Sequence, residues 1–270
     1  MNNQPAVKQD NLLAGPTFLW ILRIGVVGCF VGHGMLGVLH NAAWTPYFAV
    51  VGIGRETALG LMPWVGVFDI ALGVSVLFHP VRGVVLYTVA WCVWTALLRP
   101  LAGESGWEAI ERAGNYGASL ALLLVLTQDG SPKAGLGDRG DEKSRERVIH
   151  WVLRLTTVLL LLGHGMLNWI VQKPMFVTQY NLIGLPGAAA ISFVGVFECL
   201  LALAVLIKPD YRLLVGVVGW KLATEALNPM AGSSFWVFIE HGGSYAAPLA
   251  LAFLVSRSRT ASATGPVLAT

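Results

Sequence analysis

Eight apolar runs, each long enough to cross a lipid bilayer, constrain the fold of this chain more than any other feature. A membrane-crossing helix needs about 20 apolar residues, because each residue adds about 1.5 Å along the axis and the hydrocarbon layer is about 30 Å thick. Within that layer backbone polar groups must bond one another, so such a run folds as a helix. The sequence therefore predicts an all-α, polytopic membrane protein with eight transmembrane helices. The runs cover residues 17–39, 59–79, 81–100, 107–127, 148–170, 187–207, 211–229 and 235–256.

Composition and the distribution of charge support this prediction. Of the 270 residues, 55 % are apolar and 12 % are charged, whereas about 25 % of the residues in soluble domains are charged. The net charge of +3 comes from Lys and Arg residues that gather on one side of the predicted membrane, which is typical of cytoplasmic loops and not of a nucleic-acid partner. We therefore expect a multi-pass protein of the bacterial inner (cytoplasmic) membrane, with both termini in the cytoplasm and only Arg55 and Lys173 in the outer loops. The basic residues on the cytoplasmic side are Lys8, Arg82, Lys133, Arg139, Lys143, Arg145, Arg147, Lys208, Arg212, Arg257 and Arg259.

The two halves of the sequence resemble each other. VGHGML at residues 31–36 recurs as LGHGML at residues 162–167, and VGVFD, which ends at Asp69, recurs as VGVFE, which ends at Glu198. Such repetition indicates a duplicated unit. Because each half holds four runs, both halves start on the same membrane face, and we expect two parallel-repeat four-helix bundles. The predicted domains are a first repeat (1–127), a cytoplasmic linker (128–147), a second repeat (148–256) and a disordered tail (257–270). Further matching pairs are Trp91 with Trp220, Pro100 with Pro229, Trp107 with Trp236, Glu111 with Glu240 and Tyr116 with Tyr245.

Ionisable residues inside the predicted helices form a second pattern. An ionisable side chain in hydrocarbon must find a partner or water, so each one is a candidate functional residue. Counted along the helices, these residues fall at the midplane or in the outer half of the membrane. We therefore expect one polar chamber in each half, open to the periplasm. The first chamber is predicted to hold His33, Asp69, Glu111 and Tyr116, and the second His164, Glu198, Glu240, His241 and Tyr245.

The halves differ most in their third helix. The second half carries Lys221 and Glu225, four residues apart on one helix face, where the first half has Cys92 and Ala96. In a low-dielectric setting such a pair can ionise together or share a proton. We therefore expect the chemistry in the second half. The predicted catalytic residues are His164, Glu198, Lys221, Glu225, Glu240 and His241, and the predicted substrate-binding residues are His33, Asp69, Arg99, Glu111, Tyr116, Trp220 and Tyr245.

Three alternatives remain open for the histidines. The glycines that flank His33 and His164 also suit a small-residue contact between helices, in which the ring only bonds a neighbouring carbonyl. The two histidines together would suit a haem held by both rings. A mixture of imidazole and carboxylate ligands would suit zinc or iron. The residues available for such a metal are His164, Glu198, Glu240 and His241, which no short motif joins.

One pattern of residues resembles a known family. Arg23, the pair His33-Gly34 and Asp69 are repeated as Arg154, the pair His164-Gly165 and Glu198. This pattern resembles the DoxX/DoxD family of four-helix membrane proteins, here as two fused units. Many members of that family carry a lysine soon after the His-Gly pair, whereas Met35 and Met166 follow it in this sequence. Some members of that family are described as the membrane subunit of thiosulfate:quinone oxidoreductase. The resemblance therefore implies a redox membrane protein with a quinone as co-substrate.

Three functions fit these observations. The first is a quinone-linked oxidoreductase, or its membrane subunit, that acts on a small compound such as thiosulfate from the periplasm, directly or through a soluble redox subunit. Histidine and carboxylate side chains suit the coupled proton transfers, and Trp91, Trp220 and Tyr245 suit the flanks of a quinone ring. The second is a transporter or binding protein for a small solute, gated by Lys221 and Glu225. The third is an enzyme that modifies a membrane lipid or isoprenoid with His164 and Glu198 as acid and base.

Overall fold

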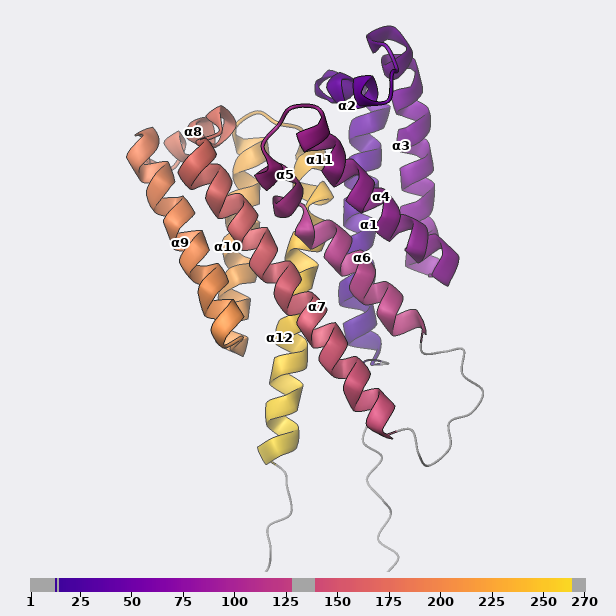
Figure 1. Cartoon of the computed structure of the whole chain (residues 1–270), viewed down its shortest axis with the longest axis vertical. Coiled ribbons are helices and arrows are strands. Elements are labelled where there is room, and N and C mark those ends of the chain that lie inside the picture. The colour runs from indigo at the N-terminus through magenta and orange to yellow at the C-terminus, as the bar shows by residue number, and fades with distance from the viewer. Residues whose placement is uncertain (1–12, 14, 128–138, 264–270) are drawn as a thin grey trace, which may run out of the picture.

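The computed structural model in Figure 1 describes residue 13, residues 15–127 and residues 139–263. This part of the chain consists of helices and connecting turns and carries no β-strand, so the all-α class is confirmed. We call residues 13–127 the first half and residues 139–263 the second half. The helices of the first half are α1 (Pro16–Val38), α2 (Thr45–Val50), α3 (Arg55–Phe78), α4 (Arg82–Leu101), α5 (Gly106–Glu111) and α6 (Ala113–Leu126). Those of the second half are α7 (Arg139–Met166), which continues into a π-helical turn, η3 (Leu167–Val171), then α8 (Pro174–Asn181), α9 (Gly187–Ile207), α10 (Tyr211–Met230), α11 (Phe235–Glu240) and α12 (Gly242–Ala263).

Six stretches of the described residues, not eight, are long and apolar enough to cross a membrane. The expected run 107–127 is divided at Arg112 into α5 and α6. The expected run 211–229 forms α10, whose mean hydropathy is lowered by Lys221, Glu225 and Asn228. The six stretches are Pro16–Val38, Arg55–Phe78, Arg82–Leu101, Lys143–Val171, Gly187–Ile207 and Phe235–Arg257.

The charged segments beside the helices differ from expectation where the structure describes them. Of the expected linker 128–147, residues 128–138 lie outside the described part, while residues 139–147 form the first turns of α7. The physical reason is composition, since Glu, Lys and Arg favour a helix. Likewise, α12 continues through residues 257–263 of the expected tail, and residues 264–270 lie outside the described part.

Four long helices form the centre of the molecule. Helices α6 and α12 contact each other, and each also contacts both α1 and α7; the apolar side chains of these four helices make up much of the main core, including Phe18, Leu122, Leu153 and Leu251. Helices α3 and α9 lie at opposite edges (Figure 1). The centre of the molecule therefore mixes helices from both halves.

Two of the short helices, α5 and α11, each pack against a long helix of the other half. Helix α5 contacts α7, and α11 contacts α1. Both begin with a serine cap, because Ser105 Oγ accepts a hydrogen bond from the backbone N–H of Trp107 and Ser234 Oγ accepts one from Trp236. Capping of this kind fixes the first turn of a helix. As a result, the last residues of α5 are presented to the second half and those of α11 to the first.

Glycines on both sides of His33 permit this crossing. A Cβ on Gly32 would overlap the backbone of Glu240 in α11, and a Cβ on Gly34 would lie 2.5 Å from the carbonyl oxygen of Gly66 in α3. Only glycine allows backbones to approach so closely. His33 therefore lies where α1 is flanked by α11 and α3 together.

His164 occupies a crossing of the same kind. A Cβ on Gly163 would overlap the backbone of Glu111 in α5, and a Cβ on Gly165 would lie 2.8 Å from the carbonyl oxygen of Gly195 in α9. The small-residue contact that one alternative describes for these motifs is thus present. It also brings each histidine beside an acidic residue of a neighbouring helix.

Candidate functional site

A cavity of about 230 Å³ lies in the first half, among α1, α2, α3 and α4. Most of its wall is apolar or aromatic, with Phe30, Trp44, Phe48, Trp91 and Trp94 among the lining side chains. A mainly apolar wall with a few polar groups is typical of a site for a small organic molecule. The polar or ionisable side chains in the wall are His33, Tyr47, Thr95, Arg99, Arg112, Asn115 and Glu240.

His33 and Asp69 form the polar pair at the wall of this cavity. The Nδ1 atom of His33 lies 2.8 Å from Asp69 Oδ2. Asp69 is fully buried, while 19 % of the His33 side chain is exposed. The indole of Trp44 stacks on the imidazole with a centroid separation of 4.3 Å. The ring of His33 is thus held between a carboxylate and an aromatic face, and it keeps an accessible edge toward the cavity.

The corresponding pair in the second half, His164 and Glu198, is buried by the side chains around it. His164 Nδ1 lies 2.7 Å from Glu198 Oε2, and only 5 % of the His164 side chain is exposed. Trp220 Nε1 donates to Glu198 Oε1 at 2.8 Å, and Asn168 Nδ2 donates to Glu198 Oε2 at 3.2 Å. The ring of Phe176 lies 4.9 Å from that of His164. The cavity and its accessible histidine therefore belong to the first half, which differs from the expectation of an elaborated chamber in the second.

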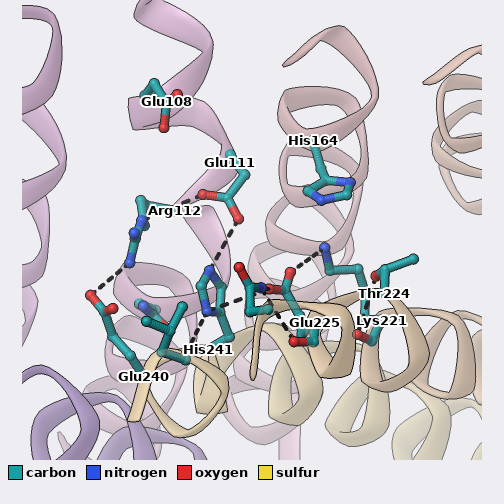
Figure 2. A network of polar contacts seen from close by, with 12 residues as sticks. Glu108, Glu111, Arg112, His164, Lys221, Thr224, Glu225, Glu240 and His241 are labelled. Atoms are coloured by element: carbon teal, nitrogen blue, oxygen red, sulfur yellow. Dashed lines mark hydrogen bonds and ion pairs between the residues drawn. The ribbon is translucent and has the colours of Figure 1, made fainter. Parts of the chain in front are cut away.

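A chain of six buried charged or ionisable side chains runs between the two pairs, and we call it the central network (Figure 2). Lys221 Nζ lies 2.7 Å from Glu225 Oε1. The other carboxylate oxygen of Glu225 lies 3.5 Å from His241 Nδ1, and His241 Nε2 lies 3.5 Å from Glu111 Oε1. His241 Nδ1 also bonds the carbonyl oxygen of Val237 at 2.8 Å. These contacts join α10, the turn between α11 and α12, and α5.

The central network continues from Glu111 to the cavity wall. Arg112 Nε lies 3.4 Å from Glu111 Oε2, and Arg112 Nη1 donates to Glu240 Oε1 at 2.7 Å. With its three glutamates ionised and Lys221 and Arg112 charged, the network has a total charge of zero when His241 carries a proton. A buried charge needs this kind of compensation. Arg112 and Glu240 also line the cavity, which places the charge of the network at its wall.

A second group of charged side chains lies beside α2, and we call it the outer cluster. Arg99 Nη1 donates to Tyr47 Oη at 3.2 Å and lies 3.3 Å from Glu104 Oε2. Glu108 lies 3.5 Å from Arg99 and 2.6 Å from Nζ of Lys173 in the second half. The hydroxyl of Tyr47 donates to Glu104. Burial raises the pKa of Tyr47 to about 12, so this hydroxyl stays protonated at neutral pH.

Two of the acidic residues lie in the opposite half of the site from the one expected. Glu111 was expected with His33 but lies beside His241, and Glu240 was expected with His164 but pairs with Arg112 at the cavity wall. The cause is the packing of α5 and α11 on the opposite halves. Tyr245 donates to the carbonyl oxygen of Phe238, and Tyr116 packs against the main core, so the cavity lining includes neither tyrosine.

The structure separates the residues of the expected haem and metal ligand sets. His33 and His164 pair with different carboxylates in different halves. The expected metal set is divided, because Glu240 pairs with Arg112 while His164 pairs with Glu198. A different trio, Glu111, Glu225 and His241, has ligand atoms within 4.8 Å of one another. Lys221 and Arg112 already neutralise the two carboxylates of this trio.

Some residues of the site were not expected from the sequence. Arg112 is the most important of them, since it joins Glu111 to Glu240. A signal was present, because Arg112 stands at the position that corresponds to His241, directly after the matching acidic residue. Trp44 and Tyr47, which line the cavity from the turn before α2 and from α2 itself, carry no such signal.

Comparisons of the chain with protein-family models, with curated proteins and with solved structures give no match, so the resemblance to the DoxX/DoxD family stays a prediction.

Proposed function

We propose that the chain is an integral membrane quinone-linked oxidoreductase, or the membrane subunit of one, that holds a quinone head group in the cavity of the first half. The observation that carries this proposal is the wall of the cavity, which combines aromatic faces with His33 and the Arg112–Glu240 pair. A quinone head group has two flat apolar faces and two polar oxygens, so it needs stacking surfaces and hydrogen-bonding groups together.

The ionisable side chains fit the proton chemistry of such a reaction. Reduction of a quinone to a hydroquinone consumes two electrons and two protons. His33 lines the cavity and is held by Asp69, so it is positioned to pass a proton to an oxygen of the head group. Behind the wall, Glu111, His241 and Glu225 form a buried series of proton-holding groups. In this proposal His33 touches the substrate, and the central network sets the charge beside it.

The electrons come from a small donor, for which the family resemblance suggests thiosulfate. Two thiosulfate ions release two electrons when they join as tetrathionate, which balances the reduction of one quinone. The donor acts directly or through a soluble redox subunit. In this proposal the outer cluster, in which Arg99 and Lys173 pair with Glu104 and Glu108, lies on the periplasmic side.

We further propose that the chain crosses the bacterial inner membrane eight times as two parallel repeats, with both termini in the cytoplasm. Helix α10, with 20 residues, and the pair α5 and α6 supply the two crossings that are less apolar. Three of their charged residues, Lys221, Glu225 and Glu111, are buried inside the molecule, whereas Arg212 is exposed in the first turn of α10. A helix with an inward charged face can cross a membrane when its partners neutralise those charges.

The test compares two tryptophan substitutions on α3. Val65→Trp fills the cavity, whereas Val67→Trp adds the same side chain at an exposed position of the same helix. Purified protein in lipid nanodiscs is given decylubiquinone and thiosulfate, and quinone reduction is followed by absorbance. We expect Val65→Trp to lower turnover at least tenfold and Val67→Trp to leave it within twofold of the wild type.

Quinone binding supplies a readout that does not depend on the donor. Decylubiquinone should quench tryptophan fluorescence in the wild type and in Val67→Trp, and much less in Val65→Trp, at equal thermal stability of the two variants. Equal quenching in both variants would show that the quinone does not bind in the cavity. Uptake of a solute into sealed vesicles without quinone reduction would favour the transporter, and chemical change of an isoprenoid would favour the lipid-modifying enzyme.

A further inference from the structure

Two cysteines of the first half lie together at the wall of the cavity. Cys29 is on α1 and Cys92 is on α4, and both residues line the cavity. A side-chain hydrogen bond joins the two thiols. Both are free thiols, and each residue keeps a small exposed fraction, 5 % for Cys29 and 6 % for Cys92. The wall of the cavity therefore holds a pair of adjacent free thiols.

The second half carries different residues at the matching positions. Leu160 corresponds to Cys29, and Lys221 corresponds to Cys92. Leu160 is fully buried, and Lys221 pairs with Glu225. A cysteine that serves packing alone behaves as a small apolar side chain. The duplicated scaffold therefore does not require a thiol at either position, and the pair occurs in the half to which the cavity belongs.

We propose that Cys29 and Cys92 form a redox-active dithiol that passes two electrons to a quinone in the cavity. Both S–H bonds break, and one S–S bond of about 2.05 Å forms between the two sulfurs. The two electrons and the two protons convert the quinone to the hydroquinone. A disulfide forms only between cysteines that already lie close to each other, which the contact between these two thiols provides. This inference rests on the proposed function, and it names the group within the chain that hands over the electrons.

His33 is placed to accept a proton from this pair. It follows Cys29 by four residues on α1, so the two side chains lie one turn apart on the same face, and both line the cavity. A thiol reacts as its thiolate, so formation of the disulfide requires a base that removes a proton. The imidazole takes that proton and passes it to an oxygen of the head group.

A sulfur nucleophile returns the disulfide to the dithiol. One donor sulfur attacks the disulfide and releases one protein thiolate; a second donor sulfur then releases the other, so the two donor sulfurs leave joined to each other. Both protein thiolates take up a proton. With thiosulfate as the donor the product is tetrathionate, and with a thiol it is a disulfide. In both cases the donor loses the two electrons that the quinone gains.

The test counts the free thiols of the whole chain. Purified protein in lipid nanodiscs is reduced, separated from the reductant and mixed without oxygen with decylubiquinone, whose ring is fully substituted and so does not add thiols. Free thiols are then labelled with a maleimide in denaturant. The chain has three cysteines, and we expect the count to fall from three to one, with one hydroquinone formed per chain. Mass spectrometry should identify a peptide pair joined through Cys29 and Cys92.

Substitutions examine each thiol separately. In Cys29→Ala and Cys92→Ala the two remaining thiols should survive the addition of quinone, and the amount of hydroquinone should fall at least tenfold. Cys199→Ala, on α9 of the second half, is the matched control; its thiol count should fall from two to zero, with hydroquinone formed as in the wild type. Thermal unfolding of each variant reports whether it folds.

A second arm identifies the donor. The oxidised wild type is separated from quinone and incubated with thiosulfate or with free cysteine, and the thiols are counted again. Recovery of three thiols with one of these compounds supports the cycle and names the donor. Recovery with neither compound would overturn the cycle.

The outcomes separate this inference from the proposed function. A count that stays at three after quinone, with quinone reduction by thiosulfate intact in the wild type and in Cys29→Ala, would overturn the dithiol and leave the oxidoreductase standing. Absence of quinone binding, while the oxidant diamide still joins Cys29 to Cys92, would instead overturn the oxidoreductase and show that the thiol pair serves another electron acceptor.

Discussion

The guanidinium of Arg112 lies 2.7 Å from the carboxylate of Glu240, although 128 positions separate the two residues in the sequence. Both side chains are buried, with 14 % and 6 % of their surface exposed. The pair joins the turn between α5 and α6 to the end of α11, and so it connects the two halves at the wall of the cavity. Its loss should therefore affect both the stability of the molecule and the ligand in the cavity.

Removal of one partner of this pair should be more harmful than removal of both. Arg112→Met leaves Glu240 buried without its cation, at a cost of about 3–5 kcal/mol in unfolding free energy. The double variant Arg112→Met with Glu240→Met removes both charges and should recover part of that loss. Thermal unfolding in detergent measures the losses of the single variants Arg112→Met and Glu240→Met and of the double variant, with the exposed Arg55→Met as a control. A double variant whose loss equals the sum of the two single losses would show that the pair does not interact.

Alanine at the helix crossings should destabilise the protein. In Gly32→Ala and Gly163→Ala the new methyl group would overlap the backbone of Glu240 and of Glu111. Such overpacking costs about 1–3 kcal/mol, and the unfolding temperature should fall. Gly60→Ala, on α3, meets no atom within 4 Å and is the matched control. Unfolding temperatures of the three variants that agree within error would contradict the crossing geometry.

The difference of one methylene between Asp69 and Glu198 should give opposite effects on stability. Asp69→Glu allows the direct bond to Trp91 and should raise the unfolding temperature. Glu198→Asp breaks the bond from Trp220, leaves its N–H buried and unpaired, and should lower the free energy of unfolding by about 1–3 kcal/mol. Changes of the same sign in the two variants, measured by thermal unfolding, would argue against the structural difference between the halves.

Tyr47 should ionise at higher pH in the folded protein than in the unfolded protein. Burial raises its pKa from 10.0 to about 12, so the folded state favours the neutral phenol. This contribution to stability is complete below pH 10 and is lost as the pH rises toward 12. The difference in absorbance at 295 nm between the wild type and Tyr47→Phe follows this one phenol. A midpoint near 10 in the folded protein would show that Tyr47 is in contact with water.

The proposed orientation can be tested with single cysteines. In a variant without Cys29, Cys92 and Cys199, a cysteine is placed at Arg55 or Lys173, which should face the periplasm, or at Lys208, which should face the cytoplasm. A membrane-impermeant maleimide added to spheroplasts should label the first two and label the third only after the membrane is opened. Labelling of position 208 in intact spheroplasts would reverse the orientation.

Local patterns in the sequence predicted much of the architecture. Long apolar runs identified the helices because an apolar stretch has few other stable structures in a bilayer. The pairs His33–Asp69 and His164–Glu198 were expected in shared chambers, and the structure places each pair in contact. The flanking glycines make the close helix contacts that one of the open alternatives describes, although the two rings bond carboxylates and not carbonyls. Each of these features depends on neighbours within a few turns of helix.

Features that depend on the packing of distant segments were not predicted. The breaks after Glu111 and Glu240 divide what look like two continuous apolar runs; Arg112 stands at the first break, and His241 followed by Gly242 stands at the second. The exchange of α5 and α11 between the halves depends on how four central helices cross, and nothing in a single helix encodes that geometry. The cavity depends on aromatic side chains of the α2 region, such as Trp44 and Phe48, which lie outside the matched motifs.

The crossing of α5 and α11 also makes the two halves interdependent. Each half contributes a carboxylate that contacts a basic side chain of the other half, so each half expressed alone leaves Glu111 or Glu240 without that partner. Two halves that are expressed as separate chains would therefore have to associate and form these contacts again before either half became stable. It also means that the first half can hold an open cavity while the second half packs closely around His164, although both halves depend on the same four central helices.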